Sequence, residues 1–202
     1  MTLSQAMHAS IVMPLLVFLS VLVLAQALER LYVFWVTEKL PTAMWERVRE
    51  KLEEGDRTGA MGVCRKNKGT LAAAILRLLA LQHPKADQLA DSYQFFRAKL
   101  QMDLSRRVGF FGTISFIAPL IGLMGTVMGI MRAFHDLAAA GAGGPAVVAA
   151  GISEALVTTA AGIGLAVFSS VLYNYFIMTV RHRLSSADLW VYELQHLLAE
   201  LK

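Results

Sequence analysis

Residues 137–180 read LAAAGAGGPAVVAAGISEALVTTAAGIGLAVFSSVLYNYFIMTV, and Glu154 is the only formally charged side chain among them. A helix crosses the hydrocarbon core of a bilayer with about 20 predominantly apolar residues, so this stretch is too long for one span. It begins with a glycine-rich segment that ends at Pro145, which is typical of a turn. We therefore predict a short loop over residues 134–145, followed by a membrane span within residues 146–180.

Two further stretches have the length and composition of membrane spans. No Asp, Glu, Lys or Arg occurs in residues 1–28, and none occurs in residues 108–131. The whole chain is 56% apolar and only 17% charged, against about 45–50% and 25% in soluble domains. The expected fold class is an all-α membrane protein with long cytoplasmic helical extensions and three transmembrane helices, in residues 1–30, 108–133 and 146–180.

The basic residues predict the direction of the spans. Residues 29–107 hold 15 Lys or Arg, whereas the region of the predicted loop holds one, Arg132. Because Lys and Arg concentrate on the cytoplasmic side of a membrane, we expect a cytoplasmic helical domain over residues 31–107 and a cytoplasmic C-terminal helix over residues 181–202. The N-terminus and the loop are then external. Residues 25–27 resemble the cleavage site of a signal peptide, but no basic residue precedes them, which disfavours that interpretation.

The segments outside the membrane have helical patterns. Apolar residues recur at helical spacing in residues 45–52 and again in residues 190–201, which indicates packing surfaces. Asp56 and Thr70 are in positions to cap two short helices. Since no glycine or proline occurs in residues 86–107, we expect one continuous helix from Ala86 to Ala133.

The sequence lacks the motifs of several functional classes. It contains no nucleotide-binding loop, no metal-ligand spacing and no nucleophilic triad, so we expect neither an enzyme nor a bound cofactor or metal. The single cysteine, Cys64, cannot form an internal disulfide. Nucleic-acid binding is disfavoured, because the 15 basic residues of the middle segment are interleaved with ten acidic ones.

The second predicted span carries a face of small residues. Gly122, Gly125 and Gly129 lie on one side of a helix, and small residues let membrane helices approach closely. We interpret these glycines as packing residues, and Pro119 as a position where the helix is able to kink. The Thr126 hydroxyl has two interpretations: it bonds to its own helix backbone, or it faces a polar path.

Glu154 is the most informative residue of the third span. An ionised side chain at the centre of a bilayer costs about 3 kcal/mol on insertion scales, and such residues normally face a bundle interior or an ion path. Two interpretations are open: a carboxylate in a proton path, or one at the outer boundary of the span that reaches water. The helical repeat places Glu154 on one face with Thr158, together with Val147, Gly151, Ala161 and Leu165. In a ring of copies this stripe would line a narrow lumen, where a glutamate that exists in neutral and charged forms is suited to passing a proton.

Two segments carry a resemblance to a known family. They are residues 116–131, FIAPLIGLMGTVMGIM, and residues 151–164, GISEALVTTAAGIG, with Tyr173-Asn174 beyond the second. Both resemble the ExbB/TolQ/MotA proton channel family. The three predicted spans are most similar to its ExbB/TolQ branch, because MotA-type chains usually have four.

The resemblance implies a bacterial inner-membrane protein with a periplasmic N-terminus, in which five copies surround a dimer of a one-span partner of the ExbD or TolR type. It implies that Glu154, Thr126 and Thr159 are polar residues of the proton path, to which the helical face described above adds Thr158. Proton flow would act through a TonB- or TolA-like protein, on import through the outer membrane or on envelope integrity. The resemblance does not separate an ExbB role from a TolQ role.

Two other functional classes compete with a proton-driven motor. One is a non-conducting membrane scaffold that only assembles partner proteins. The other is a solute transporter, which is disfavoured because the chain has few spans and lacks the internal repeat seen in many transporters.

Overall fold

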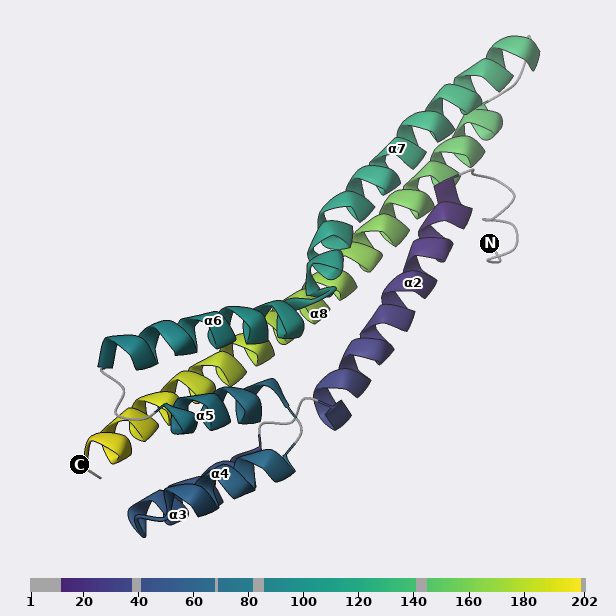
Figure 1. Cartoon of the computed structure of the whole chain (residues 1–202). Coiled ribbons are helices and arrows are strands. Elements are labelled where there is room, and N and C mark those ends of the chain that lie inside the picture. Colours follow the sequence, from purple (N-terminus) through teal and green to yellow (C-terminus); the bar gives the residue numbers. More distant parts are fainter. Residues whose placement is uncertain (1–11, 38–40, 68, 82–85, 141–144, 201–202) are drawn as a thin grey trace. The chain divides into compact units, whose positions relative to one another are not determined.

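The computed structural model describes residues 12–37, 41–67, 69–81, 86–140 and 145–200, and its regular elements are helices (Figure 1). They are α2 (Val12–Tyr32), the π-helix η1 (Val33–Thr37), α3 (Thr42–Glu53), α4 (Arg57–Lys66), α5 (Thr70–Ala80), α6 (Ala86–Ser105), α7 (Val108–Ala140) and α8 (Pro145–Glu200). Three segments are long and apolar enough to cross a membrane: Val12–Trp35, Val108–Ala139 and Val148–Leu198. The predicted all-α membrane fold with three spans is therefore confirmed.

Helix α8 is much longer than a membrane span. It has 56 residues, which at 1.5 Å per residue give a length of about 84 Å, against about 30 Å for a hydrocarbon core. The expected boundary between residues 180 and 181 does not interrupt it, since residues 178–186 contain neither glycine nor proline. One helix therefore supplies both the third span and the C-terminal extension.

The predicted continuous helix from Ala86 to Ala133 is wrong, because α6 and α7 are separated at Arg106 and Arg107. Arg107 has a φ of 63°, a left-handed conformation that an L residue adopts at a cost and that ends a right-handed helix. Its guanidinium donates a hydrogen bond to Glu29 of α2 at 2.6 Å, which stabilises the break. No glycine or proline marks this position in the sequence.

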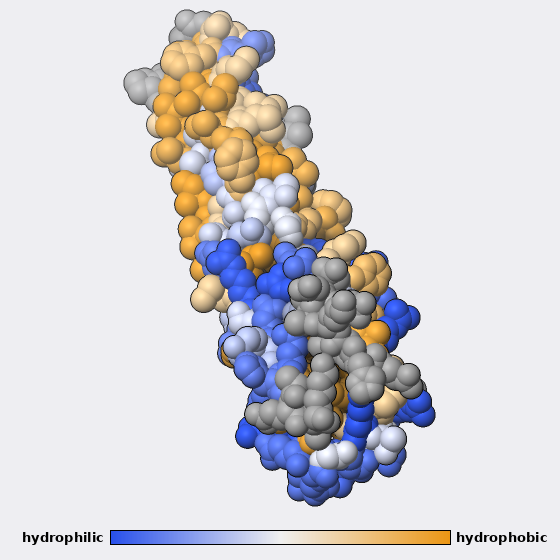
Figure 2. Space-filling model, turned by 60° about the vertical axis from the view of Figure 1, so that its left-hand side comes forward, coloured by the Kyte–Doolittle hydropathy of each residue, from blue (hydrophilic) through white to orange (hydrophobic). Residues whose placement is uncertain are grey.

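The chain divides into two compact units, and the first contains the apolar hairpin. Residues 1–31 and 107–176 form this unit, in which α7 and the first part of α8 run side by side with α2 next to them (Figure 1). Large apolar side chains such as Phe18, Phe116 and Val171 are more than half exposed here, and Figure 2 shows a largely hydrophobic surface over this hairpin. Such a surface requires lipid or an apolar partner rather than water.

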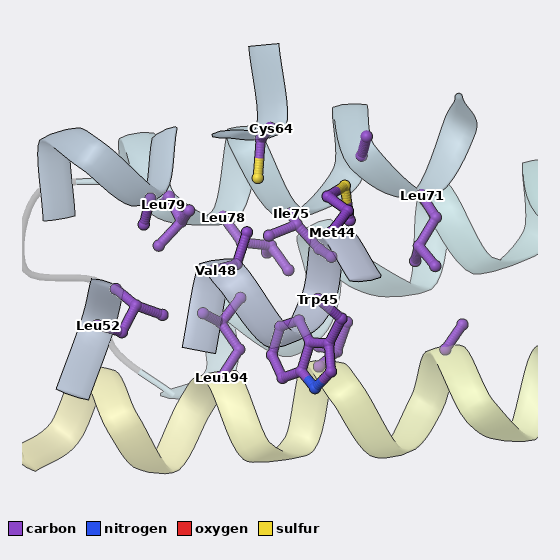
Figure 3. Packing of buried hydrophobic residues seen from close by; sticks show 14 residues of the cluster. Met44, Trp45, Val48, Leu52, Cys64, Leu71, Ile75, Leu78, Leu79 and Leu194 are labelled. Carbon is purple, nitrogen blue, oxygen red and sulfur yellow. The ribbon is translucent and has the colours of Figure 1, made fainter. Parts of the chain in front are cut away.

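The second unit, residues 32–106 and 177–202, has an apolar core of its own. Helices α3, α4 and α5 supply most of its buried side chains, and α8 completes it with Ala187, Val191 and Leu194. Figure 3 shows side chains of α3, α5 and α8 converging on this core. Trp45 of α3 stacks on Trp190 of α8 with ring centroids 5.7 Å apart. The two apolar stripes expected from the sequence are thus opposite sides of one core.

Polar contacts join α6 to α8 within the second unit. The Arg97 guanidinium donates to both carboxylate oxygens of Asp188, at 2.8 and 3.1 Å. The Tyr93 hydroxyl donates to the same carboxylate at 2.6 Å. Burial and this bond raise the pKa of Tyr93, so the hydroxyl keeps its proton and remains a donor.

One of the two predicted helix caps, at Asp56, is present, and the other, at Thr70, is not. Asp56 caps α4 by accepting a hydrogen bond from the Gly59 N–H at 2.8 Å, and this bond lowers the pKa of the Asp56 carboxyl. Thr70 is instead the first residue of α5, and Gly69 occupies the N-cap position. The expected cap at Thr70 is therefore displaced by one residue.

The single cysteine provides a probe of the second core. Cys64 is 2% exposed, and burial raises its pKa from 9.0 to about 11. Because the thiolate is the reactive form, this shift lowers the reactive population about 100-fold at neutral pH. We predict that a maleimide labels Cys64 at least about 100-fold more slowly than a cysteine at the neighbouring exposed position, introduced as Arg65→Cys in a Cys64→Ser chain. Equal labelling rates would contradict the buried core.

Candidate functional site

Helices α7 and α8 approach each other closely along a line of small residues. Gly122 and Gly129 of α7 lie on this line, as does Gly162 of α8. A Cβ atom added to Gly162 would lie 2.6 Å from the Ala118 carbonyl oxygen and 3.0 Å from the Gly122 Cα. A Cβ atom added to Gly129 would lie 2.8 Å from the Ala155 Cβ. These separations are shorter than ordinary contacts, so the approach depends on the absence of side chains, as in other membrane helix pairs.

The close approach brings together two threonines that the sequence analysis assigned to the proton path by resemblance. The hydroxyl oxygens of Thr126 on α7 and Thr159 on α8 are 2.8 Å apart, and either of them is able to donate. The Thr126 oxygen also lies 2.8 Å from the Leu123 carbonyl. Thr126 therefore bonds to its own helix backbone, as the first interpretation has it, and also to a hydroxyl of the facing helix; that it faces a polar path stays a prediction.

The Gly122 carbonyl is the common acceptor of this cluster. It lies 3.0 Å from the Thr159 hydroxyl and 3.4 Å from the Thr158 hydroxyl. Hydroxyls of α8 reach this backbone oxygen of α7 because Gly122 has no side chain between the helices. Each threonine hydroxyl thus has an acceptor where lipid offers none.

Thr158 occupies a different position from the one expected. Its side chain is 2% exposed and lies against Gly125, where an added Cβ atom would overlap its hydroxyl. Its hydroxyl donates to the Ala155 carbonyl at 2.7 Å. Leu165, from the same predicted stripe, is 9% exposed. The stripe is therefore not one open face, because the glycines turn its middle part toward α7; the side chain of Val147 lies outside the described residues.

Glu154 lies half-buried at the edge of an open hollow of about 480 Å³. The hollow lies within the first unit, where small residues of the two helices meet. Its lining combines small and charged side chains: Gly129, Arg132, Ala133, Asp136, Ala150, Gly151 and Glu154. Glu154 is therefore accessible to ions and water from one side and packed against protein on the other.

Two charged residues of the hollow did not emerge from the sequence as site residues. Residues 134–140 were expected in a loop, whereas α7 continues to Ala140. Arg132 and Asp136 consequently lie one helical turn apart on the same face. Their spacing of four residues is the signal that could have identified them.

Three further features complete the description of the site. Pro119 lies inside α7 without ending it. Ser169 of α8 is fully buried, and its hydroxyl has no hydrogen-bond partner among the described residues; a serine in an apolar stretch gave no signal for this position. No group of three or more His, Cys, Asp or Glu side chains suited to a metal ion occurs in the described part of the chain.

Comparison with known proteins relates this site to one family. Residues 68–188, which include Thr126, Glu154 and Thr159, match the sequence model of the MotA/TolQ/ExbB proton channel family. The chain is 32% identical over 114 residues to the biopolymer transport protein ExbB of Aquifex aeolicus, which covers 56% of this chain and 74% of that protein. It is 30% identical over 181 residues to the putative biopolymer transport protein ExbB-like 1 of Synechocystis, covering 87% and 70%.

Two other similarities concern the branch and the fold. The chain is 43% identical over 77 residues to the Tol-Pal system protein TolQ of Haemophilus influenzae, covering 38% of this chain and 34% of that protein. The solved structure of C. jejuni MotAB aligns over 97% of this chain and 81% of that one, with a TM-score of 0.60 and 18% identity. At this identity, the structural similarity shows a shared fold.

Two neighbouring glycines of α8 test the close approach of the helices. We predict that Gly162→Ala destabilises the protein by about 1–3 kcal/mol, because the methyl group overpacks the contact with α7. Gly164→Ala is the matched control, since nothing lies within 4 Å of a Cβ atom added there, and it is expected to be neutral or slightly stabilising. Thermal unfolding of both variants in the same mild detergent provides the measurement. Equal melting temperatures would contradict the packing described here.

Proposed function

The chain belongs to the MotA/TolQ/ExbB proton channel family, and on that premise we propose that it is the channel subunit of a proton-driven motor in a bacterial inner membrane. Glu154 is the observation that carries the proposal. It is the only formal charge in residues 137–180, and it lies half-buried beside an open hollow. In this proposal its carboxylate accepts a proton from the external side and releases it toward the cytoplasm.

The threonine pair supports a path next to Glu154. Since either hydroxyl of Thr126 and Thr159 is able to donate to the other, the direction of this hydrogen bond is reversible, which suits a group that relays or orients a proton. The proposed path therefore uses Glu154, Thr126 and Thr159. Thr158, which packs between the helices, supports the path by holding α8 against Gly125.

We propose that the working channel is a ring of five copies around a dimer of a one-span partner of the ExbD or TolR type. The exposed apolar side chains of α8, among them Leu156, Ile163 and Val167, are compatible with helix neighbours in the membrane as well as with lipid. The partner would supply a membrane aspartate to the proton step. A ring also explains how one carboxylate per chain serves a central path.

The work of the motor is proposed to reach the outer membrane through a TonB- or TolA-like protein. Relatives named ExbB and TolQ are both among the matches, so the proposal covers uptake across the outer membrane and envelope integrity alike. The competing function is a non-conducting scaffold, which requires no titratable residue in the third span.

The core of the second unit constrains the topology of the hairpin. Helices α3–α5 pack with Ala187, Val191 and Leu194, so these segments lie on the same side of the membrane. The chain between them must therefore cross an even number of times, which fits one crossing by α7 and one by α8. The excess of Lys and Arg in residues 29–107 favours the cytoplasm for this side.

We predict that a reporter fused near Lys68 reads as cytoplasmic and that a reporter fused near Gly143 reads as periplasmic. Both positions lie outside the described residues. Paired alkaline phosphatase and fluorescent protein fusions give the measurement. The reverse pattern would overturn the proposed orientation, and the same signal at both positions would overturn the hairpin.

Substitution of Glu154 tests the proposed function directly. Glu154→Gln keeps the shape and hydrogen bonding of the side chain but does not ionise, so the protein should insert and assemble normally and lose proton-driven activity. Glu154→Asp should keep part of the activity. Thr126→Val and Thr159→Val should weaken activity less, since each removes one hydrogen bond worth about 1 kcal/mol. The measurement is growth that depends on outer-membrane uptake or integrity, at protein levels checked by blotting.

The control for this series is Glu46→Gln, which removes an exposed carboxylate of α3 and should leave activity unchanged. Full activity of Glu154→Gln at normal expression would exclude the proton path and favour the scaffold.

A further inference from the structure

The hollow beside Glu154 has a composition that the proton path alone does not explain. It contains the only Lys or Arg of residues 108–180, Arg132. Arg132 shares the hollow with two carboxylates, those of Asp136 and Glu154. The proposed proton path uses Glu154 but not Arg132, so the presence of Arg132 in the hollow requires a separate explanation.

The hollow lies next to a close contact between α7 and α8. A Cβ atom added to Gly151 would lie 2.6 Å from the Ala133 Cβ, and one added to Gly129 would lie 2.8 Å from the Ala155 Cβ. The small residues therefore fill the contact between α7 and α8. The longer side chains of Arg132 and Glu154 line the hollow beside this contact.

We propose that Arg132 is the ion-selectivity residue of this site, which excludes sodium and potassium ions from the hollow and leaves Glu154 to protons. This inference rests on the proposed proton-channel function and adds its specificity. It concerns an arginine of α7 that lines the same hollow as Glu154.

The chemistry of the two kinds of ion supports this role. A proton leaves a hydronium ion and forms a covalent O–H bond with a carboxylate oxygen, so it needs no further ligands. A metal cation must replace its hydration shell with several oxygen atoms, and the oxygens of Glu154 and Asp136 are the charged candidates in the hollow. The Arg132 guanidinium attracts these same carboxylates and is able to donate charge-assisted hydrogen bonds to their oxygens. It therefore competes with a metal cation for the oxygen ligands that the cation needs, whereas a proton needs only one oxygen.

The other charges near the hollow do not replace Arg132. His135 lies 3.5 Å from the Asp136 carboxylate but is exposed on the outer side of α7. Helix α2, which contacts α7 through Val12 and Gly125, has no charged residue before Glu29. Among the described residues that line the hollow, Arg132 is the only cationic side chain beside these two carboxylates.

The test measures sodium uptake and proton flux in the same proteoliposomes. The chain is purified with its one-span partner and reconstituted as wild type, Arg132→Gln, Arg132→Lys and Arg132→Gln/Glu154→Gln. A gradient of radioactive sodium should produce no uptake in the wild type or in Arg132→Lys, which keeps the positive charge. Uptake should rise roughly tenfold or more in Arg132→Gln, in line with the effect of charge on local ion concentration, and should disappear again in the double variant.

The outcomes separate this inference from the proposed function. If the wild type conducts protons and Arg132→Gln conducts protons without sodium, the selectivity role is overturned and the channel function stands. If sodium uptake rises equally with and without Glu154, the ion passes elsewhere and the role is also overturned. If the wild type conducts no protons, the proposed function fails, and this inference fails with it.

Discussion

The close contact between α7 and α8 is the constraint on which the candidate site depends. A Cβ atom added to Gly162 would lie 2.6 Å from the Ala118 carbonyl oxygen and 3.0 Å from the Gly122 Cα, so the two helix backbones meet there without intervening side chains. That proximity places the Thr126 and Thr159 hydroxyls within hydrogen-bond distance. The longer side chains of Arg132 and Glu154 lie beside the contact, where they line the hollow. The tight contact between α7 and α8 and the open hollow beside it therefore both depend on the same small residues.

The contact between α7 and α8 differs physically from the hollow beside Glu154. In the contact between α7 and α8, threonine hydroxyls bond to each other and to the Gly122 carbonyl, so these polar groups are satisfied within the protein. In the hollow, Glu154 lies where space remains for water. A proton path needs both, because a carboxylate must reach water to titrate, and the barrier beyond it must be dry to prevent leakage.

The large features of the fold are readable from the sequence, and the finer ones are not. Apolar length and charge placement identify three spans, and Glu154 stands out because it is alone. The break at Arg107 leaves no trace in the sequence, since a left-handed arginine lacks the glycine or proline that usually marks such a position. The burial of Thr158 depends on which face of α8 the glycines of α7 select, and periodicity within one helix does not contain that information. Asp136 was missed because residues 134–140 were expected in a loop, although its spacing of four residues from Arg132 fits the helix that continues to Ala140.

The long uninterrupted α8 has a consequence for the order in which the protein is made. The core of the second unit needs Ala187, Val191 and Leu194, yet α3, α4 and α5 leave the ribosome more than 100 residues earlier. Until residues 187–194 of α8 are translated and α7 and α8 have entered the bilayer, helices α3, α4 and α5 lack part of the core that buries their apolar side chains. A chain whose third span does not insert would keep Ala187, Val191 and Leu194 away from α3, α4 and α5, and the core of the second unit would stay incomplete. Completion of this core is therefore coupled to insertion of the hairpin.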